Sequence, residues 1–188
     1  MNWNTYISLF EDIIAKKNTA TPYDNENFVN YVSLNLTRQN RWFKRGVILD
    51  ELKEEIEKIS EPQEWILISE PWCGDAAHST PFIYMASQLN DKIAFRVNLR
   101  DGNDSLIDQY LTNGASKSIP ILVVRDKDGN DLFVWGPRPK EAQILLLQHK
   151  EDETKSNEDK KIEFQAWYNK NKGVDLQMEL LEKLRSLR

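Results

Sequence analysis

The chain has 188 residues and contains a single cysteine, Cys73, and only two histidines. One cysteine excludes a disulfide within the chain, so Cys73 has no role as a structural cross-link. Free cysteine often behaves as a small apolar residue of the core. Cys73 is therefore either a packing residue of the core or a residue that takes part in the chemistry of the protein.

Basic residues are not in excess. The sequence has 25 Lys and Arg against 30 Asp and Glu, which gives a formal charge of −5. Affinity for nucleic acid rests largely on clustered Lys and Arg that displace counterions from phosphates. We therefore expect no nucleic-acid partner.

Long apolar runs are also missing. No stretch approaches the roughly 20 apolar residues that cross a bilayer. The amino terminus, MNWNTYISLFEDIIAKK, mixes acidic and apolar residues and lacks the basic start and apolar stretch of a secretory signal. We expect a soluble, cytoplasmic protein with no membrane partner.

Apolar residues at helical spacing occupy both ends of the chain. Trp3, Ile7, Phe10 and Ile14 recur at intervals of three or four, and similar stripes continue to about residue 60. After a charged run from Lys150 to Lys161, leucines recur with the same spacing to the carboxyl terminus. The pattern predicts a helical extension at residues 1–60 and a second one at residues 151–188.

The pattern between residues 61 and 150 alternates strands with helices. Short apolar runs predict strands, longer periodic segments predict helices, and a turn signal at 126–130 predicts an antiparallel hairpin between the last two strands. The predicted order is strand 65–69, helix 74–89, strand 92–98, helix 104–112, strands 121–125 and 131–135, and helix 139–148.

The segment from Glu70 to Ala76, EPWCGDA, places Cys73 between the end of a strand and the start of a helix. Ligands of α/β proteins collect at the carboxyl ends of strands. A helix amino terminus carries a partial positive charge, which favours a thiolate over a thiol. We expect the sulfur to be at least partly reachable from solvent.

The sequence resembles the thioredoxin superfamily over roughly residues 60–150. Trp72-Cys73-Gly74 matches the start of its W-C-G-P-C site, Ile119-Pro120 the cis-proline, Asp128-Gly129 the hairpin turn, and Gly136 the glycine that borders the site. The form W-C-G-D-A is similar to a bacterial thioredoxin-like branch with helical extensions. The resemblance implies an α/β fold with a mixed four-stranded sheet, helices on both faces, and a cis bond before Pro120 beside Cys73.

Two departures concern the chemistry of the site. Ala76 replaces the resolving cysteine that would attack a mixed disulfide and release the product, so the chain cannot finish that cycle alone. Asp75 replaces the proline and puts a negative charge in the first helical turn, which should raise the pKa of the thiol. A monothiol route, in which an outside thiol resolves the mixed disulfide, stays open.

Other residues are expected to line the site around Cys73. Arg100 and Arg138 are possible charge partners, for Asp75 or Asp101 or for an anionic group of a substrate. The expected lining residues are Trp72, Gly74, Asp75, His78, Ile119, Pro120, Trp135 and Gly136.

His78 could carry protons, be hydrogen-bonded, or join Cys73 and Asp75 around a metal. Three ligands so close in sequence at one helix start rarely converge on one ion. We therefore expect no metal and no other cofactor.

Two functions follow from this site. The first is a thiol redox protein in which Cys73 is the single nucleophile or sensor, with a thiol- or disulfide-bearing protein or a low-molecular-weight thiol as partner. The alternative is a non-catalytic module that binds an extended peptide at the groove beside Pro120. No pattern in the sequence indicates an oligomeric state.

Overall fold

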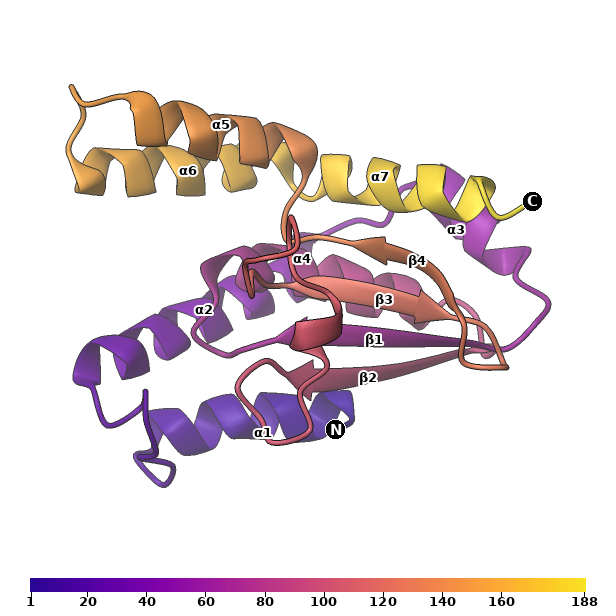
Figure 1. Cartoon of the computed structure of the whole chain (residues 1–188), viewed down its shortest axis with the longest axis horizontal. Coiled ribbons are helices and arrows are strands. Elements are labelled where there is room, and N and C mark those ends of the chain that lie inside the picture. Colours follow the sequence, from indigo (N-terminus) through magenta and orange to yellow (C-terminus); the bar gives the residue numbers. More distant parts are fainter.

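A four-stranded sheet forms the centre of the computed structural model, which describes residues 1–188 (Figure 1). The strand order is β2-β1-β3-β4. β1 runs parallel to β2 and antiparallel to β3, and β3 and β4 form an antiparallel hairpin, so the predicted mixed sheet is confirmed. The strands are β1 (Gln63–Ser69), β2 (Ile93–Leu99), β3 (Ile121–Arg125) and β4 (Asp131–Trp135).

The chain has seven α-helices, of which the three before residue 60 and the two after residue 155 form the expected helical extensions at the two termini (Figure 1). None of them combines the length and the apolar character needed to cross a membrane. The helices are α1 (Trp3–Ile14), α2 (Glu26–Arg45), α3 (Asp50–Glu57), α4 (Gly74–Ser87), α5 (Lys140–Glu151), α6 (Asn157–Asn171) and α7 (Val174–Arg185).

The helix predicted at residues 104–112 is wrong. The segment contains only a short 3-10 helix, η1 (Ile107–Gln109). Its backbone is held by the side chain of Asn98 in β2, which accepts a hydrogen bond from Leu106 N–H and donates one to the Asp104 carbonyl. These bonds to a neighbouring strand replace the bonds that a helical turn would make within itself.

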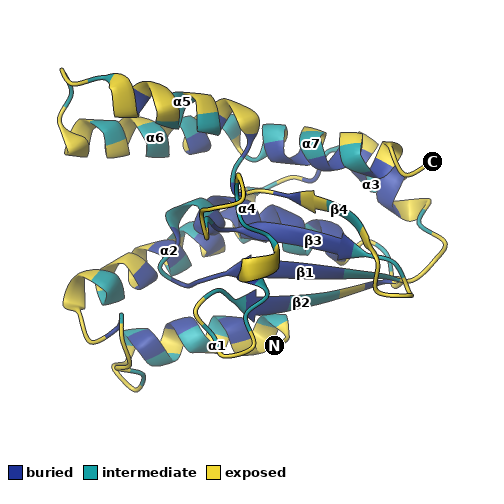
Figure 2. Cartoon of the chain, in the orientation of Figure 1, coloured by how far each residue is buried: buried dark blue, intermediate teal, exposed yellow.

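The central strands β1 and β3 are largely buried (Figure 2), and the two faces of the sheet carry two apolar clusters. Trp65, Leu67, Leu122 and Val124 pack on one side, against α4 and side chains from α1, α3 and α7. The intervening strand residues point to the other face, because side chains alternate along a strand. There a smaller cluster contains Ile66, Ile68, Ile107, Ile119, Ile121 and Val123, with Cys73 and Ala76.

The terminal helices share the larger cluster with the sheet. α1 contributes Tyr6 and Phe10, and α7 contributes Leu176, Leu180 and Leu184. The side chain of Gln177 also bonds the backbone of the segment before α3. The predicted domain boundaries near residues 60 and 150 stay a prediction.

The two edges of the sheet differ. The edge of β2 is covered by Met1, whose amino group donates to the Val97 carbonyl and whose carbonyl accepts from Val97 N–H. β4 pairs only with β3, and no backbone hydrogen bond is made along its other side. β4 is therefore a free edge strand.

Gly173 joins α6 to α7 at a position where only glycine fits. Its φ of 76° lies in the left-handed region, and an added Cβ would lie 2.6 Å from ring carbons of the buried Phe82. Gly114 has a similar φ of 71° but open space around it. Substitutions at the two glycines can therefore distinguish the effect of backbone strain from that of steric overlap.

We expect Gly173→Ala to lower the free energy of unfolding by about 3 to 4 kcal/mol, because left-handed strain adds to overpacking against Phe82. Gly114→Ala should cost only about 1 to 2 kcal/mol, because it carries the strain alone. Urea denaturation of both variants measures the difference. Equal losses would show that Gly173 does not lie against Phe82 as described.

Candidate functional site

Cys73 is the N-cap residue of α4 and follows the carboxyl end of β1. The loop that carries it is fixed from two sides. Cys73 N–H donates to the Glu70 carbonyl at 3.1 Å, and the buried amide of Asn35 in α2 donates to the Pro71 carbonyl at 3.0 Å. The sulfur is thus placed by the strand, by its own turn and by α2.

The loop before β3 lies directly against the sulfur. The Ile119–Pro120 bond is cis, as predicted, and Cys73 Sγ donates to the Ile119 carbonyl at 3.4 Å. Gly136 closes the other side of this loop with a φ of 128°, where a Cβ would collide with the Pro120 carbonyl oxygen. Any other residue at this position would push the two loops apart.

The thiol lies in an apolar setting. Only 6% of the Cys73 surface is exposed, where the sequence predicted a reachable sulfur. The residue packs in the smaller apolar cluster of the sheet. Burial, with a smaller effect of the Asp75 charge, raises its pKa to about 12, although the backbone N–H groups of Ala76 and Asp75 oppose the shift. At neutral pH the group is a thiol.

Both carboxylate oxygens of Asp75, in the first turn of α4, accept hydrogen bonds. One of its oxygens, Oδ2, accepts from Arg138 Nε at 3.1 Å and from Arg138 Nη2 at 2.7 Å. The other, Oδ1, accepts from the hydroxyl of Tyr168 in α6 at 2.6 Å. Asp75 and Arg138 are both largely buried, so this pair is shielded from solvent.

His78 is a neutral side chain in the core and does not bond to Cys73. Its Nδ1 lies 3.0 Å from Trp42 Nε1, which can only donate, so Nδ1 is the acceptor. The proton is therefore on Nε2, which donates to Gln165 Oε1 at 2.8 Å. The ring stacks on Tyr168 at 4.5 Å. Burial lowers the pKa of His78 to about 4.

A second group of charges lies at the ends of β1 and β2. Arg100 forms two hydrogen bonds with Asp101, both of 2.8 Å, and its guanidinium lies 4.6 Å from the centre of the Trp72 ring. The buried Glu70 accepts from Asp101 N–H and from the Tyr23 hydroxyl. Burial raises the pKa of Glu70. Both arginines singled out from the sequence thus already have a carboxylate partner.

The structure does not bring all expected site residues together. Trp135 packs in the larger apolar cluster and donates to Glu179 of α7 at 2.6 Å, whereas Cys73 lies in the smaller cluster. No three His, Cys, Asp or Glu side chains form a group that could hold a metal ion.

The side chains of Glu70, Tyr168 and Gln165 are among those of this region that were not predicted from the sequence. Glu70 could have been found, because an acidic residue directly after a buried strand lies at the site end of the sheet. Tyr168 and Gln165 carried no signal, since they reach the site from α6, far along the chain.

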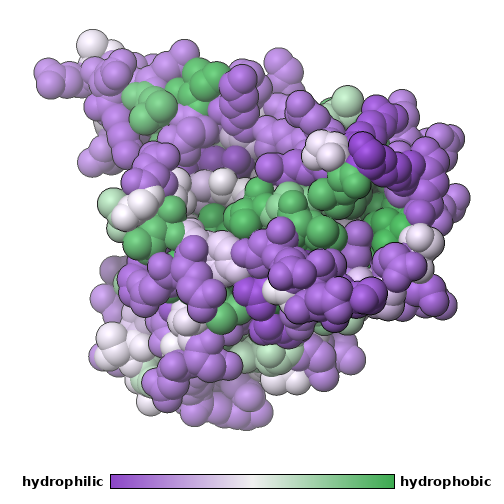
Figure 3. All heavy atoms as spheres, turned by 45° about the vertical axis from the view of Figure 1, so that its right-hand side comes forward, coloured by the Kyte–Doolittle hydropathy of each residue, from purple (hydrophilic) through white to green (hydrophobic).

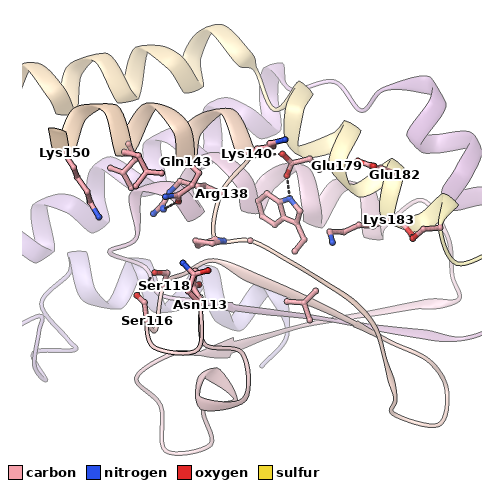
Figure 4. A pocket seen from close by; sticks show the side chains of 18 residues that line it. Asn113, Ser116, Ser118, Arg138, Lys140, Gln143, Lys150, Glu179, Glu182 and Lys183 are labelled. Carbon is pink, nitrogen blue, oxygen red and sulfur yellow. Dashed lines mark hydrogen bonds between the residues drawn. The ribbon is translucent and has the colours of Figure 1, made fainter. Parts of the chain in front are cut away.

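A groove opens beside the cis-proline loop, between β4 and the helices α5 and α7 (Figure 4). Its volume is about 1040 Å³. Ser118, Gly136 and Arg138 are among its lining residues, but Trp72 and Cys73 are not. The thiol therefore does not open into this groove.

Comparison with known proteins identifies relatives by family and by fold. Residues 22–156 match the family described as Thioredoxin. No curated protein matches the sequence.

Two solved structures resemble the whole chain. A protein of unknown function from Pseudomonas aeruginosa superposes with a TM-score of 0.61 at 12% identity, over 100% of this chain and 93% of that one. An HIV epitope scaffold superposes with a TM-score of 0.56 at 16% identity, over 99% of both chains. At these identities the likeness shows the fold alone.

We expect His78 to make the protein less stable in acid. Its folded-state pKa of about 4 lies below the ordinary value of 6.5, so the unfolded chain takes up a proton first as the pH falls. The free energy of unfolding should decrease by up to about 3 kcal/mol between pH 6.5 and pH 4 through this group.

His78→Asn keeps an acceptor for Trp42 but cannot titrate. The variant should be less stable at pH 7 and should lack this part of the pH dependence, with His149 present in both proteins. Denaturant titrations at several pH values measure how the free energy of unfolding changes with pH in the two proteins. Parallel slopes for the two proteins would contradict a neutral, buried His78.

Proposed function

Because the chain belongs to the Thioredoxin family, we propose that it is a thioredoxin-fold binding module that holds an extended segment of a partner protein at the cis-proline loop. In this proposal Cys73 does not turn over disulfides. We place the module in the cytoplasm, where a lone thiol stays reduced.

The observation that carries the proposal is the burial of the only thiol. Disulfide exchange requires a thiolate that reaches a substrate sulfur. Cys73 is buried and hydrogen-bonded to the Ile119 carbonyl, and burial raises its pKa to about 12, so the thiol form dominates at pH 7. With Ala76 in place of a second cysteine, no internal thiol can complete a cycle.

The backbone of the same loop supports binding. The N–H groups of Ser118 and Ile119 make no hydrogen bond within the chain, and Ser118 is half exposed. An extended peptide binds such backbone through main-chain hydrogen bonds, and neighbouring side chains give specificity. Trp72, also half exposed, is the side chain of the site that a partner could cover.

A monothiol redox role is the second candidate, and one observation favours it. Cys73 is the N-cap of α4, so the backbone N–H groups of Asp75 and Ala76 in the first helical turn lower the pKa of its thiol, although its side chain makes no cap hydrogen bond. They would stabilise a thiolate if the cis-proline loop moved away. An outside thiol would then have to resolve the mixed disulfide.

We expect alkylation of Cys73 by iodoacetamide in the native protein at pH 7.5 to be at least about 100-fold slower than at an exposed cysteine, because the reactive thiolate is scarce and enclosed. Cys73→Ser combined with Ser60→Cys provides that reference at an exposed position. The rate measured across pH should show no thiolate pKa below 9. A native rate equal to the reference would favour the redox role.

Capture of a partner tests binding separately from thiol chemistry. A partner bound by the native protein should be retained by Cys73→Ser and released without reductant, because no covalent bond holds it. Trp72→Ala should weaken binding by about tenfold, as expected for a central aromatic contact. Trp167→Ala is the matched control, since Trp167 is also half exposed but lies on α6. Retention that depends on Cys73 and ends on reduction would contradict the proposal.

A further inference from the structure

The groove beside β4 is bounded by three elements (Figure 4). α5 and α7 form one wall, the loop from Thr112 to Ser118 forms the other, and β4 with the residues after it forms the floor. Figure 3 shows apolar surface across the middle of the face on the right-hand side of Figure 1, between hydrophilic regions above and below. The apolar side chains that line the groove include Val134, Leu146 and Leu147.

The groove exposes the free edge of β4. Val134 and Trp135 are consecutive, so their side chains point to opposite faces of the sheet. Both line the groove, which places it along the edge of the strand. No backbone hydrogen bond is made on that side of β4, whereas Met1 covers the opposite edge of the sheet. An open strand edge is a template for another strand.

The charges around the groove are unbalanced. Lys140, Lys150 and Lys183 line it, and none of the three forms an ion pair within the chain. Glu179 and Glu182 also line the groove. Glu179 accepts from Trp135 Nε1 and from Lys140 N–H, which are neutral donors, so its negative charge remains. Three lysines against two glutamates still leave an excess of positive charge at the groove, in a chain of net charge −5.

We propose that this groove binds an extended, acidic peptide segment of a partner protein, which adds to the sheet as a fifth strand beside β4. The free N–H and C=O groups of β4 supply the main-chain hydrogen bonds. The lysines attract acidic side chains of the peptide. The apolar side chains of the wall and floor contact the peptide residues that alternate with the acidic ones.

The groove meets the carboxyl end of β4. Of the five residues of this strand, Val134 and Trp135 line the groove, which continues along Gly136, Pro137 and Arg138. Its volume is about 1040 Å³. The proposal goes beyond the cis-proline site, because Trp72, Cys73, Ile119 and Pro120 do not line this groove.

Fluorescence anisotropy with a labelled eight-residue peptide of alternating valine and glutamate tests the charge requirement. Lys140→Glu combined with Lys183→Glu should weaken binding at least about tenfold, since two attractive contacts become repulsive. Lys92→Glu combined with Lys127→Glu makes the same charge change at exposed positions outside the groove and should have little effect. Equal losses in both double variants, or equal binding of a peptide with lysine in place of glutamate, would overturn the proposal.

N-methylation tests strand addition without changing the protein. An edge strand uses the N–H groups of every second residue only, because the residues between them point their N–H groups away from the partner strand. Of two peptides methylated at odd or at even positions, one should lose binding by at least about tenfold and the other should keep it. If both peptides bind equally, the segment does not pair with β4.

Trp72→Ala separates this proposal from the one at the cis-proline loop. It should leave binding of the acidic peptide unchanged, whereas the lysine variants should leave the chemistry of Cys73 unchanged. Loss of peptide binding in Trp72→Ala but not in Lys140→Glu with Lys183→Glu would place the peptide at the cis-proline loop and overturn the assignment to β4.

Discussion

The carboxylate of Asp75 is the group on which the arrangement around the thiol depends. Its charge lies in the first turn of α4, next to Cys73. Burying this charge without a partner would cost free energy. Arg138, directly after β4, and Tyr168, in α6, together satisfy both oxygens. These contacts fix the start of α4 against the carboxy-terminal helices. Removing either partner would leave a buried carboxylate short of hydrogen bonds, so the helices are part of the site.

The network behind Asp75 extends from the site into the core. The ring of Tyr168 stacks on His78, which links Trp42 of α2 to Gln165 of α6 through its two nitrogens. The tautomer is fixed because Trp42 can only donate. A histidine that might have served as a proton carrier near a thiol is instead a neutral bridge between helices, and its low pKa follows from its burial. The polar residues at the start of α4 thus serve packing more than thiol chemistry.

The sequence predicted the features that depend on short segments. The four strands, the hairpin at Asp128-Gly129 and the position of Cys73 all follow from local patterns, and the cis bond at Pro120 followed from the family resemblance. The helix at residues 104–112 was wrong because the side chain of Asn98, on a neighbouring strand, takes over its backbone bonds. The burial of the thiol could not be predicted, since it is set by η1, the cis-proline loop and the sheet together.

The carboxy-terminal helices connect the two surfaces described above. α6 supplies Tyr168 to Asp75, and α5 and α7 form the wall of the groove along β4. Arg138 belongs to both, because it pairs with Asp75 and also lines the groove. A segment that settles beside β4 would therefore contact the residue that neutralises the charge next to Cys73. Arg138 is thus the residue at which the two surfaces meet, and its hydrogen bonds to Asp75 hold the segment after β4 against the first turn of α4.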